Sequence, residues 1–597
     1  EVENIGAPKS IAFKDGVATP AAASFASKCG ISVDEILFKD FGKGEVLYHK
    51  QKISGAFSKE LLNNMVNEFV ASLNFGKSMR WGSRSDSFIR PIRFFSIMMD
   101  NEIVEGELFG VKSSNLSYGH RMDSYEPFIF NDVGDYFCKL DKYGVVLYQD
   151  ERREKILKQI KDIEIKHNVK IELDLELLVL LGKFDEEFLE LPAEVIVTSM
   201  KANQRYFAVY KNEKLTNNFV VVSNALTNDF GYIISGNEKV LRPRLADAMF
   251  FYKNDIKNGL SNEGLKKLVF VEGLGTVYDK CEREAKIASY LAEILKIDKK
   301  DIELLQKAVM LSKADLMSEM VYEFTELQGL MGYYYSKIAK NDEKISLALK
   351  EQYLPSGENS ELPSSIFSSI VAMSNKIDNL MALFSVGKIP TGSKDPFALR
   401  RAALGVVKIA IEHKLDIDFK AIFEDLKENY KNLDLKVLNE FFIERLYKIF
   451  DSVNPTVLKA VISSGERNIY KIYQKVEALN PFVESDNFKD YSATFKRVAN
   501  IVKDIEMNSS LNIEETLFEQ DEERDLYNSF KKIKTSNFVT FDEELEALFS
   551  LKPQLDSFFE KVFVNHEDEK IKTNRKNLIA QVYLGFRNIA DIKEITI

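Results

Sequence analysis

The chain has 597 residues, of which 45% are hydrophobic and 29% charged, and its formal net charge is −11. This length predicts about four domains, and the apolar content is enough for several cores. The acidic balance argues against a histone-like or generally basic nucleic-acid binder, although local basic faces can still bind RNA. We therefore expect no DNA partner. We expect no membrane partner either, because no apolar run approaches the roughly 20 residues of a membrane span.

Cysteines and histidines are few and scattered along the chain. Cys29, Cys138 and Cys281 form neither a CxxC pair nor a disulfide framework, which is typical of a reducing cytosol and predicts a cytoplasmic protein. The five histidines form no HExxH, HxH or Cys/His cluster, so no metal site of this kind is predicted. The opening, Glu1-Val2-Glu3-Asn4, does not have the pattern of a signal peptide.

Residues 1 to about 265 mix helical and strand periods, which predicts an α+β region. Helices are expected over 19–29, 59–73 and 236–252, with a short turn of helix at 32–36. Strands are expected over 45–49, 194–198 and 219–223. The helix over 59–73 is amphipathic, with its apolar side chains at positions 61, 62, 65, 66 and 69.

Residues 77–93 are basic and surround the only tryptophan, Trp81. Arginines interleaved with aromatic residues suit a surface that faces phosphates and on which bases stack. Arg80 and Arg84 are therefore candidate RNA-binding residues. The composition fits a strand edge with solvated arginines equally well.

From about residue 264 to the end the periodicity is helical. We expect helices over 281–295, 302–311 and 314–335, and another that begins at Pro455, a residue favoured at the first helical position. Further helices contain the segments 442–446, 495–501 and 568–578.

The segment Pro390 to Ala403 is the Gly/Pro-rich break in the helical region. Gly392 permits a tight turn, Asp395 is a suitable helix cap, and Pro396 suits the first position of a helix that follows. A phosphate-binding loop is not predicted over 387–394, because Ser393 and Lys394 stand in the wrong order and a helical pattern precedes them.

Three cations lie in or beside this segment. Lys394 lies near the N-terminus of the expected helix, where anions are favoured, and Arg400 and Arg401 point about 100° apart on it. The three are candidates for tRNA positioning or subunit assembly. A capped surface helix whose arginines only anchor a domain junction fits the pattern equally well.

The run Thr-Gly-Ser-Lys-Asp-Pro-Phe-Ala-Leu-Arg-Arg-Ala-Ala at 391–403 resembles the hallmark of the bacterial glycyl-tRNA synthetase beta subunit family. The resemblance covers nearly the whole chain, including the segments at 79–93, 119–121, 200–207, 236–251, 313–332 and 559–575. It assigns Arg205, in the segment at 200–207, to the tRNA-binding surface. Compared with the sequences of this family, the chain is expected to lack the segment at the N-terminus.

Residues 266–415 are similar to HD-type hydrolase domains, and the resemblance implies an all-α HD-like domain there. The metal site of such domains needs a His-Asp pair, but Lys313 stands two residues before Asp315, and no histidine lies between His167 and His413. We therefore expect an HD-like scaffold without metal ligands.

Residues 416–597 resemble the helical anticodon-binding bundle of several synthetases. Basic residues cluster there in an otherwise acidic protein, and Lys496, Arg497, Lys572 and Arg575 are predicted to hold the anticodon arm. The expected organisation is thus multidomain: an α+β region at 1–265, the HD-like domain at 266–415 and the bundle at 416–597.

The adenylation motifs of both synthetase classes are missing from the sequence. The family resemblance implies a noncatalytic beta subunit that binds tRNA(Gly), with the alpha subunit of an α2β2 heterotetramer as the partner that uses ATP and Mg²⁺. No cofactor is expected in this chain. The alternatives are an HD-type nucleotide phosphohydrolase, which the missing histidines weigh against, and an RNA-binding scaffold with no part in aminoacylation.

Overall fold

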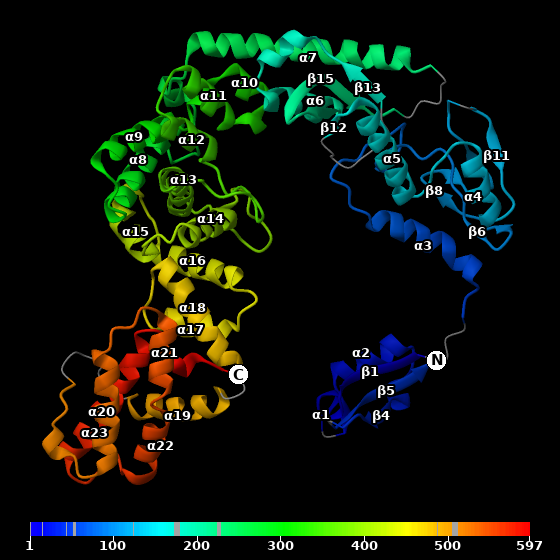
Figure 1. Cartoon of the computed structure of the whole chain (residues 1–597). Helices are drawn as coiled ribbons and strands as arrows, with labels where there is room; N and C mark the ends of the chain where they lie inside the picture. Colours follow the sequence, from blue (N-terminus) through cyan, green and yellow to red (C-terminus); the bar gives the residue numbers. More distant parts are fainter. Residues whose placement is uncertain are drawn as a thin grey trace. The chain divides into compact units, whose positions relative to one another are not determined.

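The computed structural model describes residues 2–14, 16–42, 44–51, 55–122, 124–171, 180–223, 229–485, 488–503, 505 and 511–596. The chain divides into two compact units, one of residues 1–169, 173–180 and 221–232, and one of residues 170–172, 181–220 and 233–597. Figure 1 labels their elements. Among the described residues the last strand ends at Val221 and the chain after it is helical, which confirms the coarse fold class of a mixed α and β region followed by helices.

The first unit opens with a three-stranded antiparallel sheet in the order β1 (Val2–Pro8), β5 (Glu45–Gln51), β4 (Leu37–Asp40). Helix α1 (Lys9–Ala12), the hairpin of β2 (Phe13–Lys14) and β3 (Val17–Ala18), and helix α2 (Pro20–Cys29) complete this part. The helix expected over 19–29, the strand over 45–49 and the helical turn at 32–36, here η1 (Val33–Glu35), are confirmed.

The rest of the first unit is made of one long helix, three short hairpins and two more helices. They are α3 (Ser58–Ser72), β6 (Met98–Met99), β7 (Glu102–Ile103), β8 (Glu107–Leu108), β9 (Val111–Lys112), β10 (Leu116–Tyr118), β11 (Pro127–Ile129), α4 (Val133–Lys142) and α5 (Gln149–His167). The predicted amphipathic helix is present as α3, but Leu61, Met65 and Phe69 on its apolar face are exposed.

The second unit begins with a four-stranded sheet in the order β12 (Lys170–Ile171), β14 (Phe207–Lys211), β15 (Lys214–Val221), β13 (Leu180–Lys183). The strand predicted at 194–198 is wrong. This segment lies in helix α6 (Ala193–Gln204), which follows η2 (Glu186–Glu190) and buries Val195, Ile196 and Met200. Helix α7 (Gly231–Asn258) confirms the helix expected over 236–252, with Leu241, Leu245 and Ala248 buried.

The remainder of the second unit is a succession of helices. In chain order the α-helices are α8 (Val277–Ile294), α9 (Lys299–Leu311), α10 (Glu319–Glu323), α11 (Leu330–Ile338), α12 (Glu343–Glu351), α13 (Ile366–Ser385), α14 (Leu399–Glu412), α15 (Phe419–Leu426), α16 (Leu435–Ile449), α17 (Pro455–Ser463), α18 (Ile469–Glu484), α19 (Phe488–Ile501), α20 (Asp521–Thr535), α21 (Phe541–Phe549), α22 (Lys552–Lys561) and α23 (Glu569–Arg587). The 3-10 turns are η3 (Glu263–Lys267), η4 (Ala314–Met317), η5 (Thr325–Leu327), η6 (Lys427–Asn429), η7 (Glu515–Leu517) and η8 (Ile592–Glu594). None of the described helices is long and apolar enough to cross a membrane.

The single helix predicted over 314–335 is wrong, because the structure divides this segment into η4, α10, η5 and α11. Ser318 caps α10 by accepting a hydrogen bond from the Val321 N–H at 3.2 Å. Gly329, with φ of +82°, then turns the chain into α11. The helix predicted to begin at Pro455 is confirmed as α17, with Asn454 as its cap.

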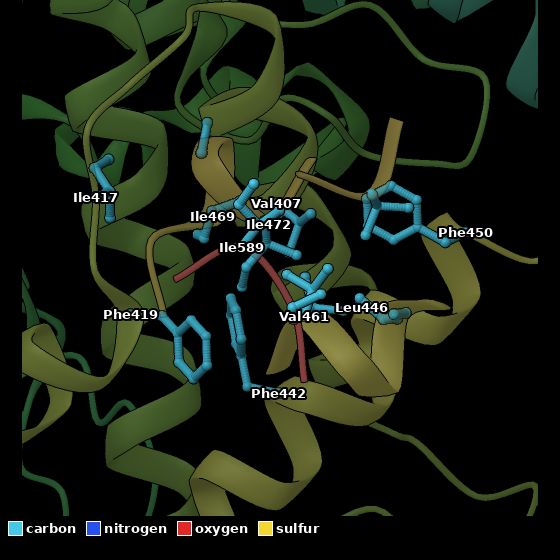
Figure 2. Packing of buried hydrophobic residues seen from close by; sticks show 14 of the residues in the cluster. Val407, Ile417, Phe419, Phe442, Leu446, Phe450, Val461, Ile469, Ile472 and Ile589 are labelled. Carbon is cyan, nitrogen blue, oxygen red and sulfur yellow. The ribbon is translucent and has the colours of Figure 1, made fainter. Parts of the chain in front are cut away.

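One hydrophobic core extends through the helices from α8 to the end of the described chain. Helix α13 is buried along most of its length and packs against α8, α9, α12, α14 and α16. Figure 2 shows buried side chains of this core, among them Val407 of α14, Phe442 of α16 and Val461 of α17. The core thus continues across residues 415 and 416, where the sequence predicts a domain boundary. The division into domains at 265 and at 415 stays a prediction.

Candidate RNA-binding surface and buried charge cluster

The basic segment at 77–93 is mostly irregular chain, tied by two backbone hydrogen bonds between Met79 and Phe88. Arg80 is exposed, whereas Arg84 donates from Nε to Asp86 Oδ2 at 2.7 Å. The Trp81 ring packs edge-on against Phe109, with the centroids 5.7 Å apart. The segment therefore presents Arg80 to solvent, while the ring of Trp81 is engaged within the first unit.

Arg205 is exposed and ends helix α6 in the left-handed conformation, with φ of 55°. Beside it, the Tyr206 hydroxyl donates to Asn237 Oδ1 of α7 at 2.7 Å. Farther along α7, Arg244 Nη1 lies 3.7 Å from Glu323 Oε1. Arg205 is thus carried by a helix end that is fixed to the neighbouring helix.

Asp395 organises the hallmark segment as predicted, but the helix begins later than Pro396. The two Asp395 carboxylate oxygens accept the N–H groups of Leu399 at 2.9 Å and Arg400 at 3.0 Å, and α14 begins at Leu399. Pro396 therefore lies in the turn before the helix. Helix α13 precedes the segment at 387–394, so the strand that a phosphate-binding loop requires is not there.

The three cations of this segment have different surroundings. Lys394 is exposed on a tight turn, closed by hydrogen bonds between its own backbone N–H and C=O and those of Thr391. Arg400 donates from Nη2 to the Gly392 carbonyl at 2.7 Å, so it holds this turn. Arg401 is exposed and lies on another face of α14.

Arg401 lines a cavity of about 340 Å³ between α14, α16 and the loop at 355–358, which we call the Arg401 cavity. Lys408 and Lys448 also line it, together with the carboxylates of Glu358 and Asp451. Lys408 donates from Nζ to the Glu358 carbonyl at 2.6 Å, and Lys448 Nζ lies 3.5 Å from Asp451 Oδ2. Three cations around one cavity favour an anionic ligand such as a phosphate.

Sequence reasoning missed Lys408 and Lys448. Lys408 follows Arg401 by seven residues, two turns of α14, and this spacing could have placed both on one helix face. Lys448 is brought to them by the packing of α16 against α14, which is a long-range contact without a local signal.

Three of the four cations predicted to hold the anticodon arm are at least partly accessible. Lys496 is half-buried on α19, and Arg497 is exposed, with its guanidinium 4.5 Å from the centre of the Phe559 ring. Lys572 is half-buried on α23, and its Nζ lies 2.9 Å from Glu569 Oε1. These contacts leave surface for a further anion.

The fourth cation, Arg575, is not on the surface of the described chain, because only 1% of it is exposed. Its Nε lies 2.9 Å from Glu523 Oε1, its Nη2 lies 2.9 Å from Glu519 Oε2, and its Nη1 donates to the Phe563 carbonyl at 3.0 Å. A guanidinium engaged in this way joins α23 to α20 and has no free donor directed at solvent.

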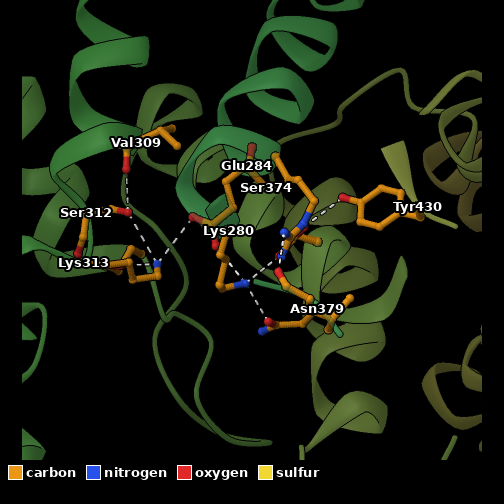
Figure 3. Close-up of polar contacts among 12 residues, drawn as sticks. Lys280, Glu284, Val309, Ser312, Lys313, Ser374, Asn379 and Tyr430 are labelled. Atoms are coloured by element: carbon orange, nitrogen blue, oxygen red, sulfur yellow. Dashed lines mark hydrogen bonds and ion pairs between the residues drawn. The ribbon is translucent and has the colours of Figure 1, made fainter. Parts of the chain in front are cut away.

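A buried charge cluster lies between α8, α13 and the turn that follows α9 (Figure 3). The Glu284 carboxylate has Lys280 Nζ at 2.9 Å on one side and Lys313 Nζ at 3.5 Å on the other. Lys280 also reaches Asp378 at 2.9 Å and Asn379 at 2.7 Å.

Asp378 is the most heavily bonded member of this cluster. Arg283 lies 2.7 Å from its Oδ1, and Tyr430 donates to the same oxygen at 2.9 Å. Burial alone would raise the pKa of Asp378, but Lys280 and Arg283 hold that pKa below its usual value. Burial would lower the pKa of Lys280, but Asp378 and Glu284 raise it. The opposite charges therefore keep one another ionised.

Asp315 explains the glycines of the motif at 313–332. Its Oδ2 accepts the N–H of Gly329 at 2.5 Å and of Gly332 at 3.0 Å, so the carboxylate caps the start of α11. A β-carbon on Gly332 would lie 3.3 Å from that oxygen. Burial raises the pKa of Asp315 to about 6, although both N–H groups lower it.

Lys313, the residue at the position where the predicted HD-like domain would need a histidine, is buried. Its ammonium donates to Gln352 Oε1 at 2.5 Å as well as facing Glu284. Among the residues that the structure describes, no group of three or more His, Cys, Asp or Glu side chains is arranged to hold a metal ion. The contacts of Lys313 with Glu284 and Gln352 thus join α8, the turn after α9 and the residue after α12.

The sequence model of a protein family, described as "Glycyl-tRNA synthetase beta subunit", matches residues 1–463 of the chain. The chain belongs to this family. A Helicobacter pylori (strain Shi470) protein named glycine–tRNA ligase beta subunit is 45% identical over 584 residues, which cover 93% of this chain and 83% of the relative. The proteins of that name from Clostridioides difficile (strain 630) and Pseudoalteromonas translucida (strain TAC 125) are 35% and 36% identical, over 90% and 89% of their lengths. The family resemblance seen in the sequence is thus confirmed. The match includes the segment at 391–403.

Proposed function

We propose that this chain is the noncatalytic, tRNA-binding beta subunit of a glycine–tRNA ligase in the cytoplasm. The observation that carries the proposal is membership of the family over most of the chain. In the proposed assembly, an α2β2 heterotetramer, this chain holds tRNA(Gly) so that the 3′ end enters the active site of the alpha subunit. Catalysis then benefits from positioning, because a held substrate reacts as if at a high effective concentration.

The segment at 387–394 does not fit a phosphate-binding loop for ATP. The candidate phosphate loop at 387–394 follows helix α13, and Arg400 closes its turn by donating to Gly392. We therefore propose that ATP and Mg²⁺ are used by the alpha subunit, and that this chain needs no cofactor of its own.

The parts of the chain have different roles in this proposal. Residues 1–265 contact tRNA or the partner, 266–415 form an HD-like scaffold, and 416–597 form a bundle that binds the anticodon arm. The scaffold role is supported by the buried charge cluster, in which Lys313 stands between Glu284 and Gln352. The phosphohydrolase alternative gains no support from this cluster, because Lys313 stands where the HD-like resemblance requires a metal-binding histidine.

The Arg401 cavity is the proposed contact with the tRNA backbone. Arg401 and Lys448 are exposed, and both line the cavity. Their neighbours Glu358 and Asp451 leave one cation in excess, which suits a single phosphate better than a dense run of phosphates. Lys394 and Arg80 are further exposed cations for the same ligand.

The proposal is tested by mass spectrometry of the native complex and by tRNA binding over a range of salt concentrations. We expect a smaller partner subunit to copurify. Arg401→Ala and Lys448→Ala should each weaken binding of tRNA(Gly) and flatten the salt dependence by about one unit of slope. Lys420→Ala is the control, because Lys420 is exposed on α15, forms an i,i+4 ion pair with Glu424 at 3.5 Å and does not line the Arg401 cavity. A chain that binds no tRNA, alone or with its partner, would refute the proposal.

A further inference from the structure

A second cavity, of about 460 Å³, lies wholly within the first unit. It is formed by the segment that leads into β6, by strand β10, by the end of β11 and by helix α4. Five of its ten lining residues are aromatic, and we call it the aromatic pocket; the lining residues used below are Phe94, Ser117, Phe130, Tyr136 and Phe137.

The rings form two groups, each with one partly exposed ring, and the Phe137 ring also stacks on Tyr148 with the centroids 6.0 Å apart. Phe94 is 43% exposed and its ring lies 5.4 Å from that of Tyr118. Phe137 is 38% exposed and follows Tyr136, whose ring lies 4.9 Å from that of Phe130. Partly exposed rings that are held against neighbouring rings form a platform for a flat ligand, because stacking needs little further ordering.

Ser117 contributes the only buried hydroxyl of this lining among the residues described. It is 2% exposed, and its Oγ has no hydrogen-bond partner within the described part of the chain. A buried polar atom without a partner costs free energy that a ligand can recover by donating or accepting one bond. An apolar protein side chain would not satisfy this atom, whereas the edge of a nucleobase would.

Positive charge adjoins the pocket through the chain itself. Arg93 precedes Phe94 directly, and Arg90 lies three residues earlier; both are exposed. Arg90 has one weak contact, from Nη1 to Met79 Sδ at 4.0 Å. Aromatic platforms with guanidinium groups alongside are the arrangement by which proteins bind unpaired RNA, with the bases stacked and the phosphates neutralised.

We propose that the aromatic pocket binds an unpaired base of RNA, with Phe94 and Phe137 as stacking surfaces and Ser117 as the hydrogen-bonding group. Arg90 and Arg93 would neutralise the phosphates on either side of that base. This inference deepens the proposed function and rests on it, since the natural ligand would be a single-stranded part of the tRNA.

The test uses the full chain and a short single-stranded oligoribonucleotide that carries 2-aminopurine, whose fluorescence falls when the base stacks. We expect quenching by the wild type. Phe94→Ala and Phe137→Ala should each weaken binding about tenfold, the effect of losing one stacked base. Phe94→Trp should retain binding, because the larger ring still stacks. Ser117→Ala should leave the thermal stability unchanged and weaken binding severalfold.

Phe69→Ala is the matched control, because Phe69 is 63% exposed on α3 and does not line the pocket. Binding of intact tRNA is measured in parallel, so the two proposals can fail separately. If the wild type binds no tRNA, the proposed function fails. If it binds tRNA but the pocket variants bind the oligonucleotide and the tRNA as the wild type does, the pocket inference alone is overturned. Loss of partner association with unchanged RNA binding would also overturn it, since it would assign the pocket to a protein side chain.

Discussion

Arg575 and Glu523 form an ion pair inside the C-terminal helices, with Arg575 Nε 2.9 Å from Glu523 Oε1 and side chains that are 2% and 0% exposed. Burial would lower the pKa of Arg575, but Glu523 and Glu519 raise it. The pair ties α23 to α20, which are far apart in the sequence. A cation that reads as an RNA contact in the sequence is therefore part of the fold.

Removing Arg575 should destabilise the C-terminal helices without a direct effect on RNA. Arg575→Ala leaves Glu523 buried and unpaired, and the expected loss is about 3–5 kcal/mol in the free energy of unfolding. Lys572→Ala, one turn earlier on α23, should change it by no more than about 0.5 kcal/mol. Thermal unfolding of both variants checks this; an Arg575→Ala protein as stable as the wild type but weaker in tRNA binding would restore the RNA role.

The stability of the protein should depend on Lys376 between pH 8 and pH 10.5. Lys376 is buried and donates to the carbonyls of Tyr353 and Pro355, and burial lowers its pKa to about 8 from 10.5. Between these values the unfolded chain binds more protons than the folded chain, so this residue makes stability rise with pH across that window.

Lys376→Met isolates this contribution, since every other titrating group is retained. The difference between wild type and Lys376→Met in the free energy of unfolding should increase in favour of the wild type by about 1–3 kcal/mol from pH 8 to pH 10.5. Denaturant unfolding at several pH values measures it. A constant difference over the window would mean that Lys376 keeps its ordinary pKa.

Gly405 should not tolerate a side chain. A β-carbon there would lie 2.8 Å from both Cδ and Cε of Lys376, which is held by its own hydrogen bonds. We expect Gly405→Ala to destabilise the protein by about 1–3 kcal/mol. Gly236→Ala is the control, because Gly236 lies in α7 with nothing within 4 Å of an added β-carbon; there alanine should stabilise the helix by about 0.5–1 kcal/mol. Equal effects at both sites would contradict the packing described.

Replacing Arg400 should lower the stability of the protein, whereas replacing Arg401 should weaken tRNA binding. Arg400→Ala removes the bond to the Gly392 carbonyl, and the expected cost is about 1 kcal/mol because the bond is partly exposed to water. Arg401→Ala should leave the melting temperature unchanged and weaken tRNA binding. Melting temperatures and tRNA affinities of both variants test this, and a loss of stability alone in both would leave only an anchoring role for the pair.

The sequence predicts the elements whose signals are local. The cap at Asp395, the start of α17 at Pro455 and the periodicity of α7 are all visible over a few residues, and the structure confirms them. The strand predicted at 194–198 fails because its β-branched residues face the core from a helix, so tertiary packing overrides the local preference.

The candidate site is harder to predict from the sequence, because the tertiary fold determines which residues pair with a charged side chain. Glu523 lies 52 residues from Arg575, and Lys448 reaches the Arg401 cavity from a different helix. The aromatic pocket likewise gathers Phe94, Ser117 and Phe137 from separate elements. The spacing of the basic residues along the sequence does not indicate which of them are buried and which face solvent.

The central claim, that this chain handles tRNA while adenylation occurs on a partner, is tested most directly by ATP–pyrophosphate exchange with glycine. We predict that the purified chain alone gives no exchange above a mock preparation, and that exchange appears when the alpha subunit is added. Glycine-dependent exchange by the chain alone, at a rate proportional to its concentration, would contradict the account.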